Sequence, residues 1–124
     1  GGTDPHQKLM FFAEARVRVF IYGQPVDARK SYDGLYALAR NEMKQDPLSG
    51  HLFCFINRRA NQVKVLYWDR SGFCLWSKKL EVGRFVSDWG QIRSSETDWT
   101  HLKLLLEGVE PKSFRKRYSR LPAT

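Results

Sequence analysis

The sequence predicts an α+β fold in which two or three helices pack on one face of an antiparallel meander sheet of about four or five strands. Three closely spaced segments rich in β-branched and aromatic residues occupy the middle of the chain, and amphipathic segments flank them. Apolar residues make up 42% of the 124 residues, enough for the core of one domain. We expect an expression scar at 1–9, a single domain at 10–110 and a basic C-terminal segment at 111–124.

The first predicted strand is the segment VRVFIY at 17–22, which is followed by a glycine. Apolar residues then recur at helical spacing, so an amphipathic helix is predicted over 31–45. Ser31 is its expected N-cap, and Pro47 lies just beyond its end.

Polar turns separate the central segments, and strands so closely linked pair antiparallel. A further short strand is expected after Gly83, and another within the polar stretch before Thr97. Thr97 or Asp98 is the expected cap of a last helix, which ends near Gly108. The predicted meander strands are 51–56, 62–68 and 73–80, with 84–86 as the fourth.

The charge balance favours polyanionic partners. Lysine and arginine number 21 against 13 acidic residues, which gives a net charge of +8. The two cysteines, Cys54 and Cys74, lie in predicted strands without metal-ligand spacing. They predict reduced thiols in a cytoplasmic protein, with no metal and no cofactor.

Basic residues interleaved with aromatic ones are the main candidate site. Lysine and arginine neutralise phosphates, whereas the alternative is a solvated outer face over an aromatic core. Arg29 and Lys30 precede a helix start, where amide groups favour anions, and Arg115 and Lys116 lie in the basic C-terminal segment. The alternative for Arg29 and Lys30 is a loop held by local ion pairs, and the alternative for Arg115 and Lys116 is a solubilising tail. The remaining candidates are Arg58, Arg59, Lys64, Arg70, Lys78, Lys79 and Arg84.

Ordered motifs from Val17 to Glu110 carry a family resemblance. The chain reads VRVF from Val17, PVDARKSYDGL at 25–35, DPLSGHLFCFINRRANQVKVLYWDRSGFCLWSKKLEVGRF at 46–85 and LLLEGVE at 104–110. This pattern resembles the insertion-sequence-66 family of transposition accessory proteins (TnpB, Orf2-like). The chain departs from the family pattern at Ala28, Asn61 and Lys79, where methionine, aspartate and arginine are usual, and after Phe85, where Trp-Pro often follows.

The resemblance implies a bacterial accessory protein that assists a separate transposase, with DNA and that transposase as partners. We expect direct DNA binding. The alternative is a protein-interaction module without DNA contact, with exposed Trp68, Trp76 and Trp89 as its binding residues.

A metal nuclease needs clustered carboxylates. Asp27, Asp69 and either Asp88 or Glu96 are candidates, but none lies in a distinctive sequence setting. We therefore expect no enzyme activity.

Overall fold

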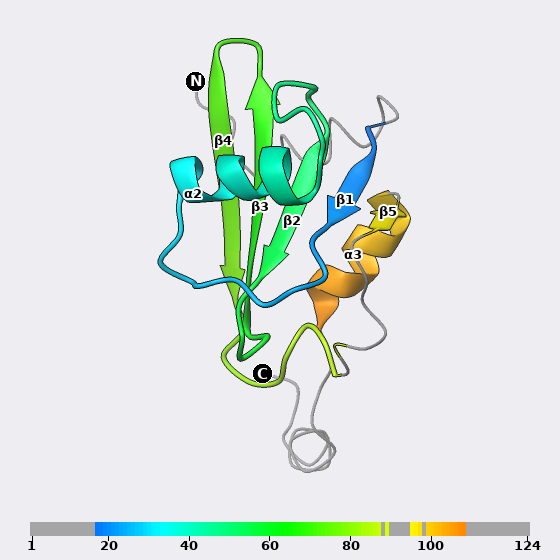
Figure 1. The fold of residues 1–124 in the computed structure, drawn as a ribbon. Coiled ribbons are helices and arrows are strands. Elements are labelled where there is room, and N and C mark those ends of the chain that lie inside the picture. Colours follow the sequence, from blue (N-terminus) through cyan, green and yellow to red (C-terminus); the bar gives the residue numbers. More distant parts are fainter. Residues whose placement is uncertain (1–16, 88, 90–94, 98, 109–124) are drawn as a thin grey trace, which may run out of the picture.

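In the part of the chain that the structure describes, a five-stranded sheet carries one α-helix on each face (Figure 1). The computed structural model describes residues 17–87, 89, 95–97 and 99–108. The strand order is β4-β3-β2-β1-β5. The elements are β1 (Val19–Ile21), α2 (Tyr32–Ala37), the π-helical turn η1 (Leu38–Glu42), β2 (Leu52–Ile56), β3 (Gln62–Asp69), β4 (Gly72–Lys79), β5 (Ser95–Thr97) and α3 (Trp99–Glu107).

The central meander is confirmed. β2 and β3 pair antiparallel, with Cys54 opposite Val65, and β3 pairs antiparallel with β4, with Val65 opposite Trp76. Because side chains alternate between the two faces of a strand, this register separates the strand residues into two apolar sets. The α+β class is therefore correct.

The prediction of a purely antiparallel sheet is wrong, because the sheet is mixed. β1 runs parallel to β2, with Val19 opposite Leu52, and β5 pairs antiparallel with β1. An ion pair of 3.1 Å between Arg18 Nε and Glu96 Oε2 joins β1 to β5. The chain returns from β1 to β2 through α2, and such a helical crossover connects parallel strands.

The prediction that the helices share one face of the sheet is also wrong. Leu35 and Ala39 pack with Phe53 and Leu66 on one face, across which α2 lies in Figure 1. On the opposite face, Leu102 of α3 joins a second apolar cluster with the other side chains of β2 and β3. All five residues of β2 are buried, so both faces of this strand need a cover.

Smaller differences concern the ends of elements. The predicted helix 31–45 forms only over α2 and η1; Ser31 is at the N-cap, but its side chain makes no capping hydrogen bond. Residues 84–86 form no regular strand. The short strand expected before Thr97 and the last helix are present as β5 and α3, in the described part of the chain.

Cys54 is a buried free cysteine and Cys74 a partly buried one. None of the helices in the described ranges is long and apolar enough to cross a membrane.

Candidate nucleic-acid interface

The turn between β2 and β3 is built by its two asparagines. Asn57 Oδ1 accepts hydrogen bonds from the backbone N–H groups of Asn61 and Gln62, both at 3.0 Å. Asn57 Nδ2 donates to Asn61 Oδ1 at 2.7 Å. Asparagine side chains commonly replace backbone partners in this way, so the turn has a defined shape.

Ala60 fixes the turn to the rest of the protein. It adopts a left-handed conformation (φ 59°) and is 2% exposed. Its N–H donates to Asn57 O at 2.9 Å, and its carbonyl accepts from the Phe85 N–H at 2.6 Å. The Leu80 N–H donates to Asn61 O at 2.7 Å. The chain after β4 therefore supports the turn from outside the hairpin.

Arg58 and Arg59 lie at the tip of this supported turn, and both are exposed. Within the described ranges, neither guanidinium has a carboxylate partner. Two further exposed cations belong to the same end of the sheet. Lys79 pairs with Gln62 at the start of β3, and Arg84 directly precedes Phe85, whose N–H binds Ala60 of the turn. We call Arg58, Arg59, Lys79 and Arg84 the basic end; exposed Glu81 is an acidic neighbour in the chain.

The segment 25–30 runs past this end of the sheet. The Val26 N–H donates to Ile56 O at 2.9 Å, and Val26 forms an isolated parallel bridge with Asn57. Further along, Arg29 Nη2 lies 2.7 Å from Asp27 Oδ2. The Arg29 side-chain hydrogen bond, and then its backbone one, hold the pKa of the Asp27 carboxyl well below its ordinary value. Arg29 is thus largely neutralised by Asp27, whereas Lys30 is exposed before α2.

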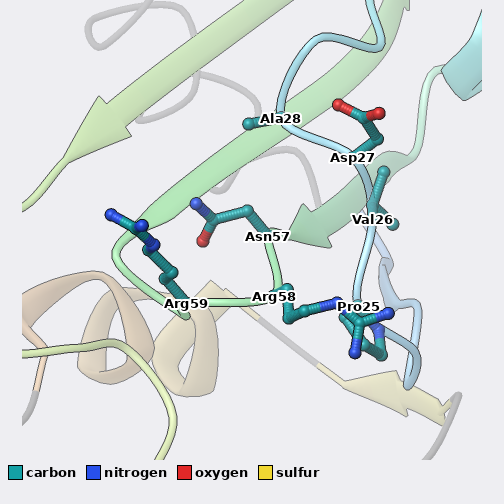
Figure 2. A pocket seen from close by; sticks show the side chains of 7 residues that line it. All are labelled: Pro25, Val26, Asp27, Ala28, Asn57, Arg58 and Arg59. Atoms are coloured by element: carbon teal, nitrogen blue, oxygen red, sulfur yellow. The ribbon is translucent and has the colours of Figure 1, made fainter.

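This segment and the asparagine turn together line a hollow of about 400 Å³. In Figure 2, Arg58 extends toward the 25–28 segment and Arg59 extends on the other side of the turn. The Asp27 carboxylate points away from both arginines. The lining residues are Pro25, Val26, Asp27, Ala28, Asn57, Arg58 and Arg59.

Two of the candidate lysines are hydrogen-bonded to backbone carbonyls. Lys64 Nζ donates to Ala28 O and Lys30 O, each at 2.7 Å. Lys78 Nζ donates to Leu106 O at 2.9 Å, at the C-terminal end of α3. Both ammonium groups therefore stabilise the packing of segments distant in sequence.

Other candidates lie away from the basic end. Arg70 is in the β3–β4 turn, at the opposite end of both strands, so the structure does not bring it together with Arg58. Arg115 and Lys116 are outside the described residues.

The three candidate tryptophans do not form an exposed group. Trp68, Trp76 and Trp89 are all partly buried, which corrects their expected exposure. Trp68 meets Phe73 edge to face, with ring centroids 5.0 Å apart. Trp76 and Trp89 instead pack against the cluster on the α3 face.

The candidate carboxylates are also dispersed. Asp27 lies beside the β2–β3 turn and Asp69 at the far end of β3, while Glu96 pairs with Arg18. Asp88 is outside the described residues. Within the part that the structure describes, no group of three or more metal-ligating side chains could hold an ion.

Comparison with known proteins identifies the family. A sequence model for IS66 Orf2-like proteins matches residues 17–116. The chain belongs to this family. Membership confirms the predicted resemblance and implies an accessory role associated with transposition.

Two relatives of this family member come from Sinorhizobium fredii. The uncharacterised protein y4jC is 39% identical over 70 residues, which cover 56% of this chain and 60% of that protein. The uncharacterised protein y4hO is 35% identical over 97 residues, covering 76% of this chain and 82% of that protein. The chain thus spans less than two thirds of y4jC. No solved structure matches the chain.

Proposed function

We propose that this chain is a non-catalytic accessory protein of DNA transposition that contacts DNA through the basic end and assists a separate transposase. The observation that carries the proposal is the pair Arg58 and Arg59, presented on a turn that the protein holds rigidly. Exposed guanidinium groups on a fixed backbone lose little freedom when they bind phosphates. Acting on bacterial DNA implies a cytoplasmic location.

The charges available for DNA differ from those counted in the sequence. Lys64 and Lys78 serve packing, Arg29 is paired with Asp27, and Arg70 lies at the other end of the sheet. Among the candidates in the described residues, the four cations of the basic end remain, and Lys30, exposed before α2, is one more. Phosphate contacts of this kind position a protein on DNA without reading its sequence.

We also propose that Arg115 and Lys116, which lie outside the described residues, contact DNA. α3 ends at Glu107, and at the next residue, Gly108, an added Cβ would lie 2.9 Å from Leu80 Cδ1 and 3.5 Å from Arg84 O. The chain therefore leaves α3 beside the basic end, and Arg115 and Lys116 follow within a few residues.

Fluorescence anisotropy tests the proposal, with labelled transposon-end duplex, scrambled duplex and single strand at low and physiological salt. If the basic end neutralises three or four phosphates, log K falls with log salt concentration with a slope of about −2.7 to −3.6. A preference for the transposon end would add sequence specificity to the role.

A matched pair of double variants locates the surface. Arg58→Gln with Arg59→Gln removes two charges from the basic end. The control pair is Lys44→Gln with Arg70→Gln. It removes one exposed charge from the connection that leads into β2 and one from the β3–β4 turn. This turn, and the start of β2, lie at the end of the sheet opposite the basic end. We expect the first pair to weaken binding at least tenfold and to reduce the salt slope by about 2, and the second to change neither substantially.

Equal effects of the two pairs would contradict the proposed surface. No binding to any of the three DNAs at low salt would contradict DNA contact altogether. The cognate transposase would then be the partner to measure, by titration calorimetry with the same variants.

A further inference from the structure

The hollow between 25–28 and 57–59 has the dimensions of a ligand site. Its volume of about 400 Å³ lies in the range of small-molecule pockets, which starts near 300 Å³. Both of its walls are fixed before any ligand arrives. The Val26–Ile56 hydrogen bond and the two bonds of Lys64 hold one wall, and the asparagine turn forms the other.

The polar side chains of the lining differ in what they can offer a ligand. Asn57 uses its amide oxygen and nitrogen within the turn. Asp27 is bound by Arg29 through both carboxylate oxygens and points away from the arginines in Figure 2. In the described part of the chain, Arg58 and Arg59 are the lining side chains left to recognise an anion.

The remaining side chains that line the hollow are apolar. Pro25 contributes a ring, and Val26 and Ala28 contribute aliphatic groups. In Figure 2, the Ala28 methyl group lies on the side of its segment that faces Asn57. The site thus combines a cationic edge with an apolar wall, and a complementary ligand carries an anionic group next to a flat, weakly polar body.

We propose that the hollow binds one unpaired nucleotide, with its phosphate on Arg58 and its sugar and base against Pro25 and Ala28. This inference rests on the proposed function and deepens it, because it names the DNA element that the site takes. A base stacked inside a duplex cannot enter a hollow, so the site selects nucleotides already out of the stack, such as those of a single-stranded overhang. Since Asn57 and Asp27 are engaged elsewhere, the base itself is read weakly.

The test compares a hairpin duplex carrying a short overhang with a blunt hairpin of equal phosphate number, by anisotropy in one buffer. Wild-type protein should bind the overhang DNA about five- to tenfold more tightly. Ala28→Met fills the hollow without a change of charge, so it should abolish this preference while blunt-duplex affinity stays constant. Ala37→Met places the same side chain at an exposed position of α2 outside the hollow and should preserve the preference.

A second measurement distinguishes a nucleotide that belongs to a DNA strand from a free nucleotide or a free phosphate. It does not require that the protein bind duplex DNA. ¹⁵N-labelled protein is titrated with thymidine monophosphate in one arm and inorganic phosphate in the other. We expect thymidine monophosphate to shift the amide resonances of Val26, Ala28 and Asn57, and inorganic phosphate to shift mainly those of Arg58 and Arg59. Saturation by thymidine monophosphate at micromolar concentration would identify a free nucleotide as the ligand. It would overturn the proposal that the bound nucleotide belongs to a DNA strand.

The failures of the two proposals are distinguishable. Duplex binding that depends on Arg58 and Arg59 but shows no overhang preference overturns the hollow and leaves the DNA-binding function standing. An overhang preference that survives in Ala28→Met does the same. Absence of binding to both hairpins at low salt contradicts the proposed function itself.

Discussion

Lys64 in β3 donates from Nζ to the backbone carbonyl oxygen of Ala28 at 2.7 Å, across a separation of 36 residues. A second bond from the same ammonium group reaches Lys30 O. Together they tie the segment that precedes α2 to the sheet, and they give this lysine a structural role within a basic surface.

Replacing Lys64 by methionine should destabilise the protein by about 1.5–3 kcal/mol, because charge-assisted hydrogen bonds are lost and two carbonyl groups lose a partner. Urea denaturation followed by tryptophan fluorescence measures this free energy of unfolding. Lys79→Met, an exposed position on the same face of the sheet, should change it by less than about 0.5 kcal/mol. Equal stability of the two variants would show that the Lys64 bonds contribute nothing.

Lys78 should control the attachment of α3. Its Nζ lies 2.9 Å from Leu106 O, where a cation also favours the negative end of the helix dipole. Lys78→Met should cost about 1–2 kcal/mol and accelerate amide hydrogen exchange in α3. Exchange in α2, on the opposite face, is the internal control, and a uniform acceleration in both helices would contradict a local role.

Arg70 should be replaceable with a gain in stability. It is exposed and adopts φ 55° in the β3–β4 turn, a conformation that costs most residues roughly 1 kcal/mol and asparagine less. Arg70→Asn should raise the melting temperature by about 2–6 °C. The variant should keep wild-type affinity for DNA, and a lowered melting temperature would reveal a stabilising contact of the arginine side chain.

Cys54 should make stability fall at alkaline pH. The thiol is fully buried, and desolvation raises its pKa to about 12. In the unfolded chain the Cys54 thiol ionises near pH 8.5–9. The contribution of its burial to the free energy of unfolding is therefore complete below that range and declines as pH rises toward 12. Between pH 7.5 and 10 the wild type should lose about 1–2 kcal/mol more than Cys54→Ala.

Paired urea curves at the two pH values, for each protein, measure that difference. Any constant cost of the cavity in Cys54→Ala cancels in the comparison. Identical pH dependence in the two proteins would contradict the effect of burial on this thiol.

The central meander could be predicted from sequence because its information is local. The segments 62–69 and 72–79 are rich in strand-forming residues, and a short turn leaves them no pairing except an antiparallel one. The parallel pairing of β1 with β2 had a sequence signal as well, namely a strand, a helix and a strand in succession. The continuous apolar run of β2 (LFCFI) likewise indicated a strand covered on both faces.

The site was less predictable. Arg58 and Arg59 stand out because a polar turn between two strands is exposed, whatever the rest of the fold does. Nothing local distinguishes Lys64 and Lys78 from Lys79, since their partners are carbonyl groups 36 and 28 residues away. The asparagines Asn57 and Asn61 lie in one of the polar turns that the sequence predicts, but their mutual bonding, which gives the hollow its second wall, depends on the three-dimensional arrangement.

The pairing of β1 with β5 affects how the protein is made. β1 is the first described strand along the chain and β5 the last, yet they are neighbours in the sheet. On the ribosome, the meander can form as soon as residue 79 has emerged. One edge of β1 stays unpaired, and the sheet face that α3 covers stays exposed, until residues 95–107 have also emerged. During that interval the nascent chain exposes an unpaired strand edge beside uncovered apolar side chains, which is the species most prone to aggregate.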